Sequence, residues 1–191
     1  AVGHSSKRFH WPGCPPCVVA VIFLTIFAFL PPLLLALPHP AGPRAQVRVP
    51  RVGSPPKIED FLTMEPRGEI AGKMAKVEGF TQYIPKDGEP ATQPTEAYFG
   101  YDDENFYAVY LCFDPEPSKI RARLARREKI LDDDFVVLDL DTFHDQRRAY
   151  QFWSNPLGVQ SDNRWTEGAG LDFSFDTVWH SRGQITDQGY V

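Results

Sequence analysis

The chain has 191 residues, a net charge of −5, a hydrophobic fraction of 42% and an aromatic fraction of 13%. This apolar content is enough for one packed core of ordinary domain size. Because neutralising phosphates requires an excess of Lys and Arg, the acidic balance argues against a nucleic-acid-binding protein.

An apolar leader precedes the predicted domain. Lys7 and Arg8 stand before an apolar run from Cys17 to Leu30, and a Pro pair and a second short apolar run follow. A basic start with such a run is typical of a secretory signal, and a span of roughly 20 residues also suffices to cross a bilayer. Residues 1–45 are therefore predicted to be a signal peptide or membrane anchor plus linker. The protein is expected to be exported, to the periplasm, the outer membrane or the extracellular space.

Residues 46–191 form the predicted domain, and the Pro- and Gly-rich stretch up to Pro56 is typical of a linker at its start. The clearest element is a hairpin, in which 95–101 and 106–113 flank the turn sequence Asp102-Asp-Glu-Asn105. The segment 120–127 has a helical composition, but its apolar and Arg residues alternate and favour a strand. Further strands are predicted at 78–84, 135–141, 150–154, 158–160 and 177–185. Short strands with no convincing long helix predict an all-β sandwich or barrel.

A strand that opens and closes on carboxylates is the second feature of interest. Asp134 and Asp141 bracket this strand. Because Asp is disfavoured inside strands, these acids indicate a solvent-exposed face that binds a polar ligand. The run Asp132-Asp-Asp134 could also help to hold calcium, which prefers several oxygen ligands. The run lacks the alternating spacing of a dedicated calcium loop, and a solvated turn is the competing interpretation.

Tryptophans and planar polar groups are the candidate sugar ligands, because an aromatic ring packs under a pyranose and planar groups bind hydroxyls in pairs. Trp153 and Asn155 share one strand face, Trp165 lies in a predicted polar loop, and Trp179 lies near an aromatic run. For each tryptophan, packing in the core is the alternative.

Two arginines are further candidates for hydroxyl recognition. Arg126 and Arg127 precede the acidic strand and could each bind a pair of hydroxyls. Ion pairing with Asp132, Asp133 or Asp134 is the alternative.

From Pro55 to Val191 the sequence resembles the family 9 carbohydrate-binding module, in the form found at the N-terminus of large exported bacterial proteins. The segments that carry the resemblance include Pro55-Pro-Lys-Ile58, Asp87-Gly-Glu-Pro-Ala-Thr-Gln-Pro-Thr-Glu96, Tyr101-Asp-Asp-Glu-Asn-Phe-Tyr107, Asp114-Pro-Glu-Pro-Ser-Lys-Ile-Arg-Ala-Arg-Leu124, Asn155-Pro-Leu-Gly-Val-Gln160 and Phe175-Asp-Thr-Val-Trp179.

The resemblance implies a jelly-roll-type antiparallel β-sandwich related to the DOMON group. It implies non-catalytic glycan binding linked to carbohydrate catabolism, with a long C-terminal region that looks like an outer-membrane barrel. Two departures stand out. The family's entry sequence has Glu59-Asp60 in place of Asp-Gly, and Met64-Glu-Pro-Arg67 replaces the usual acid-plus-tryptophan segment. One edge of the family's sugar site is therefore in doubt.

Several alternatives stay open. The domain could be a structural part of an outer-membrane protein without sugar affinity, or part of a glycoside hydrolase. A haem-binding relative would need axial ligands, for which His144, His180, Met64 and Met74 are available. Exposed rings in one concave patch would favour sugar binding, whereas buried Trp153 and Trp179 would favour the structural role. Gln188-Gly-Tyr190 is typical of a turn leading into another strand, so the domain is expected to be truncated at its C-terminus.

Overall fold

The computed structural model describes residues 46–191, which form one compact unit. The predicted signal peptide or anchor in residues 1–45 lies outside the described residues. Among residues 46–191, no helix has the length and apolar character needed to cross a membrane.

The described residues form two antiparallel sheets with very little helix, which confirms the expectation of an all-β fold. The first sheet has the order β1-β2-β3-β9-β8, with bounds Ala75–Val77, Thr95–Tyr101, Phe106–Phe113, Gly189–Tyr190 and Ile185–Thr186. The second has the order β4-β5-β6-β7, with bounds Val136–Leu140, Arg148–Ser154, Gln160–Thr166 and Gly170–Asp172. The helical turns are η1 (Ile58–Asp60), α1 (Gly68–Ala71) and η2 (Pro117–Lys119).

The β2–β3 hairpin has the predicted bounds and turn. Its register pairs Tyr101 with Phe106 at the turn and Thr95 with Cys112 at the far end. The Asp102 carboxylate closes the turn, because its Oδ1 accepts bonds from the backbone N–H groups of Glu104 and Asn105 at 2.9 and 2.8 Å. The aromatic and β-branched residues of both strands thus meet across the ladder.

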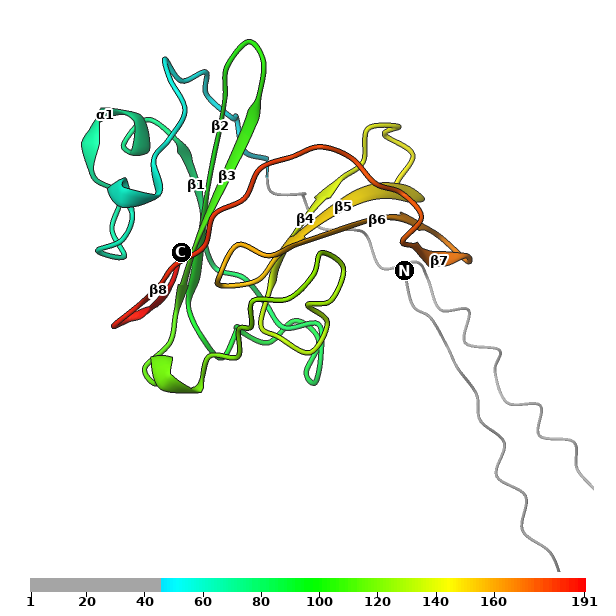
Figure 1. The fold of residues 1–191 in the computed structure, drawn as a ribbon. Helices are drawn as coiled ribbons and strands as arrows, with labels where there is room; N and C mark the ends of the chain where they lie inside the picture. Colours follow the sequence, from blue (N-terminus) through cyan, green and yellow to red (C-terminus); the bar gives the residue numbers. More distant parts are fainter. Residues whose placement is uncertain (1–45) are drawn as a thin grey trace, which may run out of the picture. The chain divides into compact units, whose positions relative to one another are not determined.

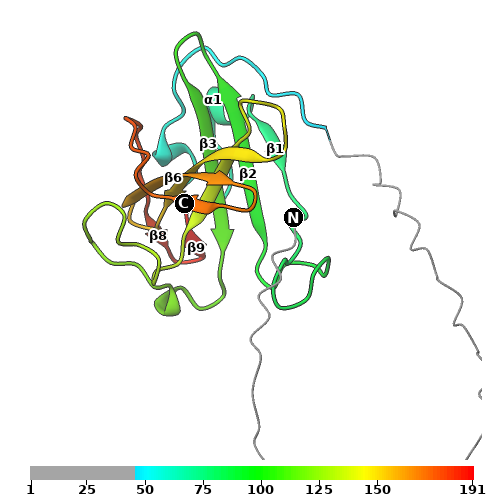
Figure 2. The same cartoon turned by 90° about the vertical axis from the view of Figure 1, so that its right-hand side faces the viewer.

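The main core lies on one face of the first sheet, under the N-terminal segment. Fully buried Phe61 packs on Tyr98, with ring centroids 5.6 Å apart, and Leu111 is also fully buried in the same cluster. Figure 1 shows α1 on one side of β1–β3 and the second sheet on the other; viewed from that side in Figure 2, the second sheet crosses in front of β2 and β3. The first sheet is therefore covered by different elements on its two faces.

The predicted linker is partly wrong, because residues 50–52 belong to the fold. Val52 is buried, and its N–H donates to the Tyr101 carbonyl at 2.8 Å. The Tyr101 N–H in turn donates to the Pro50 carbonyl at 3.1 Å. This bridge adds the segment to the edge of the hairpin beside its turn.

The strand predicted at 120–127 is also wrong, and side chains explain why. The Arg121 N–H donates to Asp134 Oδ2 at 2.8 Å, and the Arg123 N–H donates to Asp133 Oδ2 at 3.2 Å. The Arg123 carbonyl accepts a bond from the Asn155 amide at 3.0 Å. The backbone groups that a neighbouring strand would need are therefore bound to carboxylates and an amide.

Three other strand predictions need correction. The strand predicted at 78–84 lies earlier, at β1, and leaves only an isolated bridge between Thr81 and Pro90. Of 177–185 only Ile185 is in a strand, since the segment before it runs irregularly across the second sheet. The short strand predicted at 158–160 begins instead at Gln160 and continues through Thr166, so Trp165 lies in β6 rather than in a loop.

Candidate functional site

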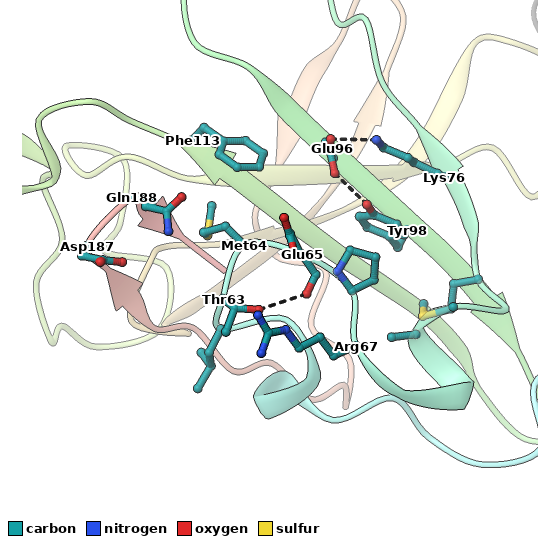
Figure 3. A pocket seen from close by; sticks show the side chains of 15 residues that line it. Thr63, Met64, Glu65, Arg67, Lys76, Glu96, Tyr98, Phe113, Asp187 and Gln188 are labelled. Atoms are coloured by element: carbon teal, nitrogen blue, oxygen red, sulfur yellow. Dashed lines mark hydrogen bonds and ion pairs between the residues drawn. The ribbon is translucent and has the colours of Figure 1, made fainter.

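An open groove lies on the outer face of the first sheet, between the N-terminal segment and the β8–β9 turn (Figure 3). It encloses about 970 Å³. Its lining combines residues of the 62–74 segment, one or two side chains from each of β1, β2 and β3, and Asp187 with Gln188 from the β8–β9 turn. The described domain thus has a surface hollow large enough for a small ligand.

The Glu96 carboxylate is the fixed polar centre of the groove (Figure 3). Its Oε1 lies 2.7 Å from Lys76 Nζ, and its Oε2 accepts a bond from the Tyr98 hydroxyl at 2.6 Å. Strand geometry explains the cluster. Glu96 and Tyr98 are two residues apart in β2 and therefore point to the same face, and Lys76 in β1 lies directly opposite Tyr98. Lys76 also contacts Glu78 at 2.7 Å.

The electrostatics keep this carboxylate ionised. Partial burial alone would raise the pKa of Glu96, but the bonds from Lys76 and Tyr98 outweigh it and lower that pKa. Burial, together with the bond to Glu96, raises the pKa of Tyr98 to about 12. The ion pairs with Glu78 and Glu96 raise the pKa of Lys76. At neutral pH the Glu96 cluster therefore consists of an oriented carboxylate, the Lys76 ammonium and the neutral Tyr98 phenol.

The rim of the groove carries polar groups with no internal partner. The Arg67 guanidinium and the Gln188 carboxamide form no side-chain bond with any residue of 46–191, while their backbones are anchored. The Arg67 N–H donates to the Asp60 carbonyl at 2.7 Å, and the Gln188 carbonyl accepts a bond from the Asp114 N–H at 2.9 Å. Half-buried Phe113 adds an aromatic ring to the same lining. These are planar groups on a fixed backbone, which suits recognition of hydroxyls.

The predicted platform residue Trp153 does not lie in this groove. The residue is only 8% exposed, and its ring stacks on Phe135, with centroids 4.7 Å apart and planes at 20°. Its Nε1–H donates to Gln151 Oε1 at 3.2 Å. The ring is therefore engaged in packing, and the structure does not present it as an exposed platform.

Asn155, the predicted partner of Trp153, is a structural residue in this arrangement. It is 2% exposed, and its amide donates to Asp133 Oδ2 and to the Arg123 carbonyl, both at 3.0 Å. Its Oδ1 accepts bonds from the Leu157 and Val159 N–H groups at 3.0 and 2.9 Å. The Asn155 side chain thus uses both its Nδ2 and its Oδ1 to hold the turn that follows it and the 120–134 segment.

The other two tryptophans lie on opposite faces of the second sheet. Trp165 is half-buried in β6, on the same face as Trp153. Trp179 packs edge-on against Phe152, which belongs to the other face, with centroids 5.4 Å apart. The structure therefore does not gather Trp153, Trp165 and Trp179 into one concave patch.

Arg127 is half-buried and bound in an ion cluster. Its Nε donates to Asp162 Oδ1 at 3.0 Å, its Nη2 donates to the Thr177 carbonyl at 2.7 Å, and Asp176 lies 3.2 Å away. The bond to Asp162 raises the pKa of Arg127. The alternative considered for Arg127, ion pairing, is met with other partners than Asp132 to Asp134, since Asp132 and Asp133 bind Arg123 and Arg127 pairs with Asp162 and Asp176.

The remaining candidates lie apart from the groove. Arg126 is exposed on the 120–127 segment. Asp134 is bound to the backbone of Arg121. The Asp141 carboxylate accepts bonds from the backbone of a turn, including one from the Gln146 N–H at 2.7 Å, and these bonds hold its pKa below the ordinary value. Asp134 and Asp141 therefore organise local backbone.

A polar row that sequence reasoning missed crosses the second sheet. The register places Asp139, Gln151 and Asn163 side by side on one face. Asp139 is exposed, whereas Asn163 is fully buried and neither its Oδ1 nor its Nδ2 has a partner. An unpaired buried polar group costs about 1–3 kcal/mol. This row can be recognised only from the pairing register of the three strands, which the sequence alone does not give.

The side chains considered as metal ligands do not lie together in the part of the chain that the structure describes. Residues 46–191 contain no group of three or more His, Cys, Asp or Glu side chains placed to hold an ion. The Asp132–Asp134 carboxylates considered for calcium bind Arg121 and Arg123. Met64 and Met74, considered as haem ligands, are buried in the core under the N-terminal segment.

The groove-lining residues were not candidates for sugar binding in the sequence, although one signal pointed to them. Met64 to Arg67, where the family's usual tryptophan segment is replaced, line the groove. Met64 adopts a φ of +58°, which is uncommon for a residue with a side chain, and its side chain enters the core. Glu65 and Arg67 remain exposed on the rim.

Comparison of the chain with protein-family models, curated proteins and solved structures finds no match.

Proposed function

We propose that this protein is a non-catalytic glycan-binding module, built as a jelly-roll-type β-sandwich, and that its ligand occupies the groove over β1–β3. The observation that carries this proposal is the ionised Glu96 carboxylate, held by Lys76 and Tyr98 inside an open groove. A carboxylate fixed in this way accepts hydrogen bonds from hydroxyl groups without having to reorient.

The rest of the lining supports the same ligand class. Arg67 donates and Gln188 both donates and accepts, and neither side chain has a partner within the described domain. The Phe113 ring offers an apolar surface for the C–H face of a sugar. Oligosaccharides combine these two kinds of surface, whereas a purely apolar ligand would leave the polar rim unpaired.

Binding is favoured over hydrolysis because of the protonation state of the site. A glycosidase needs one carboxylic acid with a raised pKa to protonate the leaving group, opposite a second carboxylate. The bonds from Lys76 and Tyr98 shift the pKa of Glu96 in the other direction. Glu96 is thus suited to accept hydrogen bonds and unsuited to donate a proton.

The proposal also includes export of the protein and the place of this domain in a larger one. The basic and apolar leader favours export, and the resemblance to family 9 modules favours a place at the N-terminus of a larger envelope protein with a barrel-like C-terminal region.

A structural domain without sugar affinity is the second candidate. The burial of Trp153 and Asn155 favours it, because both are used in packing.

Calorimetric titration with xylo-, cello- and manno-oligosaccharides tests the proposal. We expect saturable heat with at least one of them, and Glu96→Gln should weaken that binding about tenfold or more, because bonds to a charged group contribute about 1.5–3 kcal/mol. Glu69→Gln is the matched control, since Glu69 also pairs with a lysine but lies outside the groove. An absence of heat with all three glycans from folded protein would favour the structural candidate.

A further inference from the structure

The charged side chains that line the groove do not balance one another. The lining contains three carboxylates, those of Glu65, Glu96 and Asp187, but only two cations, Arg67 and Lys76. Glu65 and Asp187 are exposed, and Figure 3 shows Glu65 between Asp187 and the Glu96 cluster in that view. Because the three carboxylates come from separate parts of the lining, negative charge extends along the groove.

The ammonium of Lys76 offsets less of this charge than one cation could. Its Nζ lies 2.7 Å from Glu96 Oε1 and also 2.7 Å from Glu78 Oε2, so two carboxylates share one ammonium. Arg67 is the other cation of the lining, and two exposed carboxylates remain beside it. A hollow in a protein surface concentrates such an excess of one charge on whatever binds there.

We propose that the groove prefers glycans with protonated amino groups, such as β-1,4-linked glucosamine oligomers, over neutral glycans and disfavours glycans that carry carboxylates. This inference rests on the proposed glycan-binding function and names the class of glycan. An ammonium group donates hydrogen bonds and accepts none, so it matches the carboxylates of Glu65, Glu96 and Asp187. The carboxylate of a uronic acid would meet the same groups and be repelled.

The groove and an amino sugar carry opposite charges together at mildly acidic pH. The bonds from Lys76 and Tyr98 lower the pKa of Glu96, so its carboxylate stays ionised there. A sugar amine, in contrast, gains its proton as the pH falls. The affinity for glucosamine oligomers should therefore rise from slightly alkaline to mildly acidic pH. The affinity for cello-oligosaccharides, which have no ionisable group, should change little.

Calorimetric titration at mildly acidic pH with glucosamine oligomers and cello-oligosaccharides of equal length tests the preference. Both are β-1,4-linked pyranose chains, and they differ only at C2, where an ammonium replaces a hydroxyl. We expect the glucosamine oligomer to bind about fivefold more tightly or better, because one partly exposed ion pair contributes up to about that factor. Added salt should reduce this advantage, and galacturonate oligomers should bind more weakly than either chain.

Two groove variants and one control locate the source of the preference. Glu65→Gln and Asp187→Asn should each lower the ratio of the affinity for the glucosamine oligomer to the affinity for the cello-oligosaccharide. Glu104→Gln is the matched control and should leave this ratio unchanged, because Glu104 is exposed in the hairpin turn and does not line the groove. Lysine peptides of the same charge as the glucosamine oligomer show how much binding comes from attraction to an acidic protein alone.

The outcomes separate this inference from the proposed function. Equal affinity for the two oligomers, tighter binding of galacturonate oligomers, or lysine peptides that bind as tightly as the amino sugar would overturn the inference. So would a preference that neither Glu65→Gln nor Asp187→Asn reduces. Saturable heat with cello-oligosaccharides would in each case leave the proposed glycan binding standing. An absence of heat with every glycan, from folded protein, would contradict the proposed function and the inference with it.

Discussion

Arg127→Met is expected to lower the free energy of unfolding by about 3 kcal/mol or more, because it leaves a buried charge unpaired. Asp162 is fully buried, and Arg127 is the cation that neutralises it. The Thr177 N–H donates to Asp162 Oδ2 at 2.9 Å, and this bond should remain in the variant, which keeps the expected loss near the lower end of the range for buried pairs. Arg127 also holds the Thr177 carbonyl, so the irregular segment across the second sheet should loosen as well.

Urea denaturation followed by circular dichroism measures this loss. Arg147→Met is the matched control, because Arg147 and Glu167 form a pair at 3.0 Å whose side chains are 71% and 47% exposed. Such surface pairs contribute about 0–1 kcal/mol. Equal destabilisation by the two variants would show that the Arg127–Asp162 pair is not the buried anchor described above.

Asn155→Ala is expected to cost about 3 kcal/mol, since it removes one side chain that connects two segments. The change leaves the Leu157 and Val159 N–H groups without their acceptor and takes one donor from Asp133, which is 5% exposed. Each buried group left unpaired costs about 1–3 kcal/mol. The 120–134 segment should become more mobile, because Asn155 also holds the Arg123 carbonyl.

The same variant separates a structural role for Asn155 from a ligand-binding one. Thermal and urea unfolding should show the loss of stability, while the glycan affinity of the protein that remains folded should be unchanged. Asn105→Ala, in the exposed hairpin turn, is the control and should alter stability by no more than about 0.5 kcal/mol. A variant with normal stability but lost glycan affinity would show that Asn155 binds the ligand.

The sequence predicted those elements whose signals are local. The β2–β3 hairpin has its predicted bounds, because strand-forming residues flank a turn that Asp102 closes by itself. The segment 120–127 failed for the opposite reason. Its alternation is that of a strand, but its backbone is bound by Asp133, Asp134 and Asn155, which lie up to 32 positions away along the chain.

The candidate site was harder to predict than the fold. Tryptophans are candidate sugar ligands because of their chemistry, yet Trp153 packs on Phe135 and Trp179 packs on Phe152. Only the three-dimensional structure distinguishes a packed ring from an exposed one. The groove is lined both by residues 62–67 and by Asp187 and Gln188, which lie far apart in the sequence of the described domain. The one local hint was the unusual Met64-Glu-Pro-Arg67 segment.

We expect the groove over β1–β3, and not the tryptophan-bearing second sheet, to be the ligand site. Titrating ¹⁵N-labelled protein with the oligosaccharide that gives the largest heat, and following amide shifts by NMR, tests this most directly. We predict that the amides of Glu65, Arg67 and Gln188 shift, together with that of Glu96, while those of β5 and β6 stay in place. Shifts centred on Trp153, Trp165 and Asn163, with the groove amides unmoved, would contradict it.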